Sequence, residues 1–144
     1  MHEDSYFVFE CLLKHPKIVI CDDIVISYRL SDNSASREQF SEKLFDITYF
    51  AERKKDIIEK AYPEFLPLAE NVIVKANMAL LWNLLRTDDP RYKSAEKAAI
   101  KNVCDRKSYY IMAKKSDAKL FWILTHHLYG VYKLLYKLRS KALG

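Results

Sequence analysis

Apolar residues from Ser41 to the end of the chain recur every three or four positions, which is the spacing of a helix face. The pattern breaks at Tyr62-Pro63 and again at Pro90, since proline disfavours helix in the residue before it. The sequence therefore predicts successive helices over this region. Their expected buried stripes are Phe40, Leu44, Ile47, Ala51, Ile57, Ile58 and Ala61; Leu68, Val72, Ala76, Ala79, Leu80 and Leu84; and Ala95, Ala99 and Val103.

A last helix is predicted from about Ala118 toward Arg139, with Ser116 and Asp117 as its N-cap. Gly130 lies inside this segment, where glycine costs about 1 kcal/mol relative to alanine. We therefore expect a kink or a close contact at Gly130.

The front of the chain follows a different pattern. Residues 5–15 predict a helix that ends at His15-Pro16. Two runs rich in isoleucine and valine, 17–21 and 24–30, predict a β-hairpin or two consecutive strands, and a polar loop at 31–36 follows. The predicted fold is mainly α, a helical bundle with a small N-terminal β-hairpin or strand pair. The apolar face of the first helix is expected to contain Phe7, Cys11 and Leu12, widened by Tyr6, Phe9 and Leu13.

Composition is consistent with this fold. A length of 144 residues suits one domain, and two glycines and four prolines favour long helices over a turn-rich β protein. The three cysteines, Cys11, Cys21 and Cys104, lack the spacing of a zinc site and indicate buried thiols in a reducing compartment. The sequence shows no signal-peptide pattern and no apolar run of about 18 residues, so a membrane-spanning helix is not expected.

Charge is distributed unevenly around a net value of +5. The first 40 residues hold seven acidic and four basic residues, whereas the segment from Arg106 onward holds nine basic residues and Asp117 alone. Such asymmetry suggests an anionic partner for the C-terminal end. A membrane surface suits the last helix, which carries an aromatic and cationic set typical of headgroup contact. The alternative is a core helix with a solvated basic end, and nucleic acid is not expected because no recognisable binding fold accompanies the charges. The aromatic and cationic residues of the last helix are Trp122, Tyr129, Tyr132, Tyr136, Lys133, Lys137, Arg139 and Lys141.

Few residues suggest catalytic chemistry. Glu3 and Asp4 open the first helix, where they either cap it through its dipole or act as catalytic carboxylates. His126 and His127 point about 100° apart on a helix, so they cannot share a metal, and we expect one to face the core and one the solvent. Cys11 and His15 have i,i+4 spacing, but no third group beside them would orient the imidazole, which favours a structural cysteine. The sequence has no GxGxxG, P-loop, GxSxG or HExxH motif.

The order of several features resembles the C-terminal part of bacterial family-2 glycosyltransferases, inverting enzymes of the GT-A fold. The resemblance spans about residues 2–50 and rests on the run 2–7 (His-Glu-Asp-Ser-Tyr-Phe), the strand pair, Tyr28-Arg29, and the run 33–36 (Asn-Ser-Ala-Ser). It implies that residues 1–40 are the edge of a catalytic domain, an α+β remnant of a GT-A domain, and that residues 41–144 are a helical extension.

The resemblance assigns roles to individual residues. Asp4 would be the general base that deprotonates an acceptor hydroxyl, and Glu3 would position it or bind the acceptor. Substrate binding would fall to four later residues near the donor diphosphate or the acceptor, where a guanidinium can bind anionic oxygens. These four are Tyr28, Arg29, Asn33 and Ser34.

The family's nucleotide-binding βαβ units and acidic metal-binding motif are not in this chain. Asp22-Asp23 is no substitute, because it follows the base motif instead of preceding it. We therefore expect no cofactor here and a divalent metal only with the missing half. Nucleotide-sugar and glycan acceptor would be partners of the full-length enzyme, and the isolated chain would be inactive.

Two hypotheses follow. The first is the C-terminal fragment of a glycosyltransferase of polysaccharide biosynthesis, cytoplasmic and in peripheral contact with the inner face of the membrane through the C-terminal helix. The second is a non-enzymatic helical module that binds a partner protein or an anionic membrane surface. In either case, exposed apolar surface could be covered by self-association into a homo-oligomer.

Overall fold

The computed structural model describes residues 3–15, 17, 19, 41–87, 89–111 and 115–142. These residues are mainly helical, and no β-strand occurs among them. The predicted hairpin at 17–30 falls almost entirely outside these ranges. The α-helices are α1 (Glu3–Lys14), α2 (Asp46–Ala61), α3 (Leu66–Thr87), α4 (Lys93–Asp105), α5 (Lys115–Thr125) and α6 (Tyr129–Ala142). Short 3₁₀ helices precede or follow several of them: η2 (Glu42–Phe45), η3 (Pro63–Phe65), η4 (Pro90–Tyr92) and η5 (Lys107–Tyr109).

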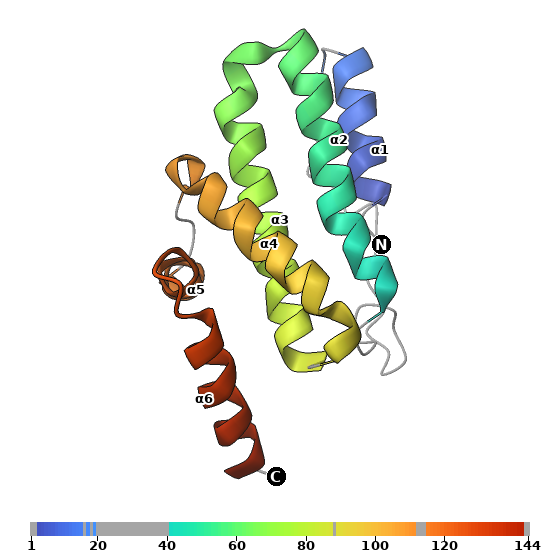
Figure 1. Ribbon diagram of the computed structural model, residues 1–144. Coiled ribbons are helices and arrows are strands. Elements are labelled where there is room, and N and C mark those ends of the chain that lie inside the picture. The colour runs from blue at the N-terminus through green and yellow to red at the C-terminus, as the bar shows by residue number, and fades with distance from the viewer. Residues whose placement is uncertain are drawn as a thin grey trace.

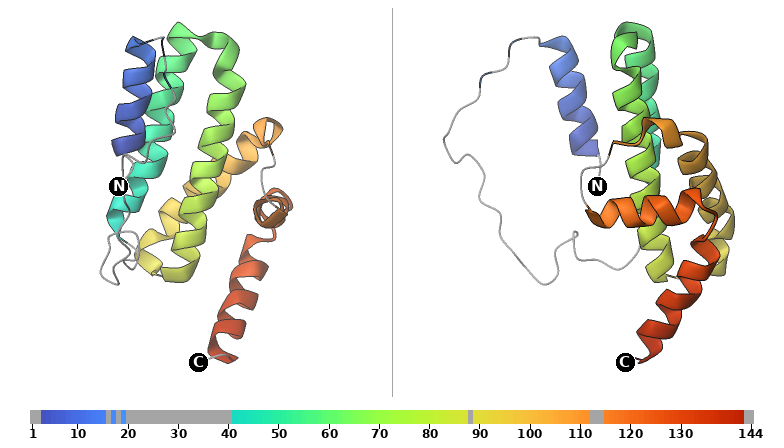
Figure 2. Two further views of the ribbon diagram at one scale, coloured as in Figure 1. Left: turned by 180° about the vertical axis from the view of Figure 1, so that it is seen from behind. Right: turned by 90° about the vertical axis from the view of Figure 1, so that its left-hand side faces the viewer.

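Helix α3 is the centre of the bundle (Figure 1). Helices α1 and α2 lie along one side of it, α4 crosses it on another, and α6 extends away from the bundle below α5 (Figures 1 and 2). The sequence of α3 is apolar on several sides, which is typical of a helix buried between neighbours. Its fully buried side chains include Ile73, Val74, Leu81, Leu84 and Leu85.

Two groups of buried side chains hold the bundle together. The smaller joins α2 to α3 through Ala51, Ile73 and Ala76. The larger joins α3 to the later helices, because Leu81 and its neighbours pack with residues of α4, α5 and α6. Those partners are Ala99, Val103, Leu124 and Tyr129. The expected stripe of α4 is thus confirmed, with Ala99 and Val103 buried.

The helix ends follow local signals in the sequence. Tyr62 ends α2 directly before Pro63, as predicted. The Asp89 carboxylate accepts a hydrogen bond of 2.9 Å from the backbone N–H of Arg91, with Pro90 at the first position of η4. The Asp89 cap thus satisfies a backbone donor that has no partner inside η4.

The predicted stripe of α3 is partly wrong. Leu68 and Val72 are about half exposed, whereas Ala69 and Ile73 are buried. The first turns of this helix carry apolar residues on several sides, so periodicity alone does not identify the inward face. From Ala76 onward three of the four predicted residues, Ala76, Leu80 and Leu84, are buried. The fourth, Ala79, is half-buried.

The prediction of one continuous last helix is also wrong. Helix α5 starts at Lys115, before the predicted Ser116-Asp117 cap, and ends at Thr125. His127 then adopts a left-handed conformation with φ of 59°. The N–H of Leu128 bonds to the carbonyl of Ile123 at 2.9 Å, and the N–H of His127 bonds to the carbonyl of Leu124 at 3.1 Å. This pair of bonds is a Schellman motif, which terminates α5.

The chain therefore turns at His127 and not at Gly130. A Cβ atom added to Gly130 would meet nothing within 4 Å, so no close contact requires glycine there. The left-handed residue of a Schellman motif is usually glycine, since a side chain is strained in this conformation.

Replacing His127 by glycine is expected to stabilise the protein by about 0.5–1 kcal/mol, because it removes the strain of a left-handed residue with a Cβ atom. Urea unfolding measures the change. His126→Gly is the matched control and is expected to destabilise, since His126 has no positive φ and its ring stacks on Trp122 at 4.4 Å. A lower stability of His127→Gly would contradict the proposed strain.

Candidate functional site

The acidic pair predicted to be catalytic lies at the start of α1. Asp4 is exposed to solvent in the first helical turn, and Glu3 is the first residue of the helix. Acidic residues in this position also interact favourably with the helix dipole, by about 0.3–1 kcal/mol. An exposed carboxylate is open both to solvent and to a substrate, so its position alone fits either role.

Contacts with α2 fix α1 in place. The rings of Tyr6 and Phe50 lie 5.1 Å apart, and the Lys54 ammonium lies 5.7 Å from the centre of the Phe9 ring. Lys54 Nζ also donates a hydrogen bond of 3.1 Å to Ser5 Oγ. Burial lowers the pKa of Lys54, consistent with an ammonium group packed between the helices. Asp4 is therefore carried by a helix that is anchored on the bundle.

The outer face of α1 is apolar and exposed. Phe7 is 66% exposed and Val8 and Leu12 are about half exposed. Of the predicted apolar face, Tyr6 and Phe9 contact α2, whereas the expectation is wrong for Phe7 and Leu12, which are exposed. Because α1 is apolar on both sides, its periodicity could not distinguish the two faces. Asp4 thus lies beside apolar surface that no described residue covers.

The other predicted site residues cannot be placed relative to Asp4. Tyr28, Arg29, Asn33 and Ser34 lie outside the described residues. The structure brings together only the Glu3 and Asp4 positions of the predicted set, in one helical turn.

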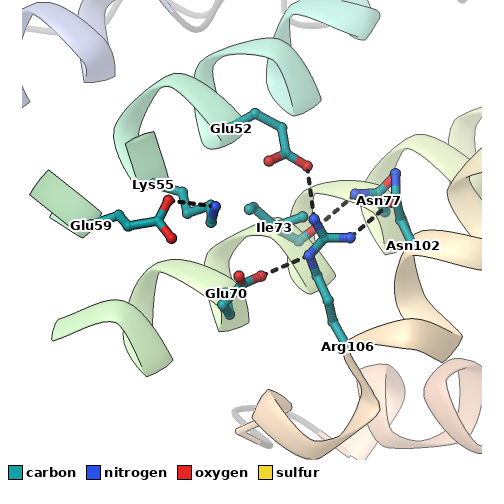
Figure 3. Close-up of polar contacts among 8 residues, drawn as sticks. All are labelled: Glu52, Lys55, Glu59, Glu70, Ile73, Asn77, Asn102 and Arg106. Carbon is teal, nitrogen blue, oxygen red and sulfur yellow. Dashed lines mark hydrogen bonds and ion pairs between the residues drawn. The ribbon is translucent and has the colours of Figure 1, made fainter. Parts of the chain in front are cut away.

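The sequence did not suggest a polar network centred on Arg106, at the end of α4 (Figure 3). Arg106 Nε donates to Glu70 Oε2 of α3 at 2.7 Å, and Nη2 donates to Glu52 Oε1 of α2 at 3.4 Å. Nη1 donates to Asn102 Oδ1 at 2.8 Å, and Asn102 Nδ2 donates to the buried Asn77 at 3.4 Å.

The network is built to join helices. All three guanidinium nitrogens of Arg106 already have acceptors within the protein, which leaves little capacity to bind a substrate anion. The i,i+4 spacing of Asn102 and Arg106 was the one local signal in the sequence. We assign the network a structural role, linking α2, α3 and α4.

Several contacts hold the basic, aromatic α6, beginning with its buried first residue, Tyr129. Lys133 Nζ donates to Glu96 Oε1 of α4 at 2.5 Å, and the ring of Tyr136 lies 6.2 Å from that of Trp82 on α3 in an edge-on arrangement. Lys133 was expected to contact an anionic surface, but its ammonium group instead pairs with Glu96 of α4. Three other residues of α6, Val131, Leu134 and Leu138, are each 57% exposed.

The histidine and cysteine candidates offer no site. His126 and His127 are both exposed, contrary to the expectation that one faces the core, because the helix ends at this point. Cys11 and Cys104 are free and only half-buried. Burial raises the pKa of Cys104, whose Sγ lies 3.6 Å from the carbonyl of Leu124. Such a thiol is a poor nucleophile at neutral pH.

No group of three His, Cys, Asp or Glu side chains that could hold a metal ion occurs in the part of the chain described. Across the same ranges, every helix is too short or too polar to span a bilayer.

Comparison with protein-family models finds no match, and neither the curated proteins nor the solved structures yield one. The function is therefore inferred from the residues and their arrangement.

Proposed function

We propose that this chain is the acceptor-side region of an inverting family-2 glycosyltransferase and that Asp4 is its general base. The proposal rests on the sequence resemblance of residues 2–50. One structural observation supports it best: Asp4 is exposed on a helix that α2 anchors, beside the uncovered apolar residues Phe7, Val8 and Leu12. A carboxylate at the wall of a substrate cleft needs both a fixed position and access to the substrate.

In the proposed reaction, Asp4 accepts the proton of an acceptor hydroxyl. The hydroxyl oxygen forms a bond to the anomeric carbon of the donor sugar as the bond from that carbon to the diphosphate oxygen breaks. The nucleoside diphosphate leaves with the bonding electron pair, and the configuration at the anomeric carbon inverts. A divalent ion would neutralise the charge of the diphosphate, and no described residues form a site for it.

The exposed apolar face of α1 has a defined place in this proposal. Phe7, Val8 and Leu12 would be covered by the nucleotide-binding half of the enzyme, which would also supply the opposite wall of the cleft. Sugar transfer by the full product of the gene, with Asp4 intact and replaced, tests the proposal and is argued in the Discussion.

A second function is favoured by the exposed face of α6. Val131, Leu134 and Leu138 follow i, i+3, i+7 spacing and therefore lie along one side of the helix. The sequence places Lys137, Arg139 and Lys141 on the same helix. Apolar residues flanked by cations suit an interfacial helix on an anionic membrane.

Sedimentation with vesicles of phosphatidylglycerol and phosphatidylcholine tests this second function. Replacing Leu134 and Leu138 by serine is expected to weaken binding by about tenfold or more, since each leucine would lose apolar burial in the membrane. Leu68→Ser is the matched control, because Leu68 is similarly exposed but lies on α3. Equal sedimentation of the double variant and the control would argue against a membrane role for α6.

A further inference from the structure

A hollow of about 560 Å³ lies between α3, α5 and α6. Its volume falls in the range of small-molecule sites, about 300–1,000 Å³. Residues of α3, α5 and α6 line the hollow. Figures 1 and 2 show how these three helices are arranged. The residues that matter are Lys75, Met78, Trp82 and Asn83 of α3, Lys119 of α5 and Tyr132 of α6.

The spacing of the α3 residues explains how the wall forms. Lys75, Met78 and Trp82 are separated by three and four positions, so they lie on one face of the helix. Met78 is buried and continues into the core, whereas Trp82 is 42% exposed and borders the opening. The α3 wall therefore consists of the apolar side chains of Met78 and Trp82, with the cation of Lys75 at the end next to Met78.

Among the described residues that line the hollow, the charged ones are Lys75 and Lys119, and none is acidic. Within the described ranges neither lysine forms an ion pair. Lys75 is half-buried, so its charge is only partly screened by water. An anionic group between the two lysines would complement both.

The remaining lining is suited to hydrocarbon. Met78 adapts its shape to an apolar ligand, and the aromatic faces of Trp82 and Tyr132 offer flat apolar surface. Burial raises the pKa of Tyr132, which indicates that this side of the hollow is poorly hydrated. The amide nitrogen of Asn83 donates one of its two N–H groups to the carbonyl of Ala79 at 2.9 Å, which orients this polar side chain in the lining.

We propose that this hollow binds a single-chain anionic amphiphile, a long-chain carboxylate whose head group lies between Lys75 and Lys119 and whose alkyl chain packs against Met78, Trp82 and Tyr132. The site uses no residue of the proposed sugar-transfer machinery, and it stands or falls independently of that function. Its chemistry follows from two cations among the described residues of a mainly apolar lining, none of which is acidic.

Fluorescence titration with dodecanoate, kept below its micelle-forming concentration, tests the proposal. Trp122→Phe is introduced first, so that Trp82 is the remaining tryptophan; Trp122 is 53% exposed, which makes the change tolerable. Saturable binding that alters Trp82 emission is expected. Dodecanol, which has the same chain without charge, is expected to bind at least about tenfold more weakly.

Two variants in the same background locate the site. Replacing Lys75 and Lys119 by glutamine is expected to weaken dodecanoate binding by at least about tenfold, whereas the matched change of Lys97 and Lys101, two exposed lysines of α4, leaves it unchanged. Ala79→Phe, which places a ring into the hollow, is expected to block binding of both ligands. Circular dichroism verifies that each variant folds.

Three outcomes would overturn the proposal. The first is equal affinity for dodecanoate and dodecanol, and the second is equal loss in the two lysine variants. The third is a loss of binding to anionic vesicles in the Lys75/Lys119 variant without any loss for monomeric dodecanoate, which would identify the lysines as a membrane-contact surface and not as a ligand site.

Discussion

Replacing Asp4 by asparagine is expected to lower the rate of sugar transfer by about 100- to 10,000-fold, the range contributed by a positioned general base. Asparagine keeps the shape of the side chain but cannot accept the proton of the acceptor hydroxyl. Loss of the charge weakens the helix-dipole interaction by at most about 1 kcal/mol, so the fold should survive. The measurement is the initial rate of sugar transfer, assayed with nucleotide-sugars and a divalent metal. The protein assayed is the full product of the reading frame that contains this chain.

The control for this experiment is Asp56→Asn, which removes an exposed carboxylate from α2 and is expected to leave transfer unchanged. The isolated chain is expected to show no transfer under the same conditions. Unchanged activity of Asp4→Asn would contradict the assigned base. A gene that begins at Met1 and lacks any nucleotide-binding half or Asp-x-Asp motif would remove the basis of the enzymatic proposal.

The existence of most helices could be predicted because their signals are local. Tyr62-Pro63 ends α2, and Asp89 with Pro90 begins η4, so short stretches of sequence determine these boundaries. The stripe of α4 could be predicted too, since Ala95, Ala99 and Val103 recur every four positions and therefore lie on one face of the helix.

The inward faces of α1 and of the first turns of α3 could not be predicted. Both helices present apolar residues on several sides, and only the neighbouring helix decides which side is buried. Phe50 of α2 contacts Tyr6 of α1, which turns this side of α1 inward. Ala51 of α2 packs in one group with Ile73 of α3. Periodicity contains no information about such a choice.

The turn between α5 and α6 was missed for a related reason. The low helix propensity of glycine led us to expect a kink at Gly130, which is three residues after the actual turn. His127 takes the left-handed conformation at this turn, and the hydrogen bond from Leu128 to Ile123 compensates for its strain.

Of the candidate site, the family resemblance suggests Asp4 as the general base, and this assignment stays a prediction. The structure supplies the contacts that fix its helix. The Arg106 network was beyond prediction, because Glu70 and Glu52 lie 36 and 54 positions away from Arg106 in the sequence. A single sequence contains many possible pairs of opposite charge at such separations, and only the packing of helices selects among them.

Replacing Arg106 by methionine is expected to destabilise the protein by about 2–3 kcal/mol. Methionine preserves much of the apolar stem, so the loss is mainly that of the guanidinium. The Glu70 side chain is only 12% exposed, and without Arg106 its carboxylate would remain in a poorly hydrated position with no cation. Leaving a buried charge unpaired is the costly part, whereas the contact with Glu52, 40% exposed, adds little.

Urea unfolding measures this loss, with Arg91→Met as the matched control. Arg91 also forms an ion pair, with Asp89 at 2.6 Å, but its side chain is 75% exposed, so its removal is expected to cost much less stability than the removal of Arg106. The loss of stability in Arg106→Lys should lie between the losses in Arg106→Met and Arg91→Met. An ammonium group keeps the charge but cannot reach three acceptors in the fork geometry of a guanidinium.

A double-mutant cycle separates the pair from other effects. In Arg106→Met the unpaired Glu70 carboxylate is expected to cause most of the loss of stability. If so, Arg106→Met combined with Glu70→Gln should lose less stability than the sum of the two single changes. Additive losses, or a loss below about 0.5 kcal/mol for Arg106→Met alone, would mean that water replaces Arg106 at little cost. In that case the apolar contacts of Ala51, Ile73 and Val103, and not the polar network, would hold α2 and α4 on α3.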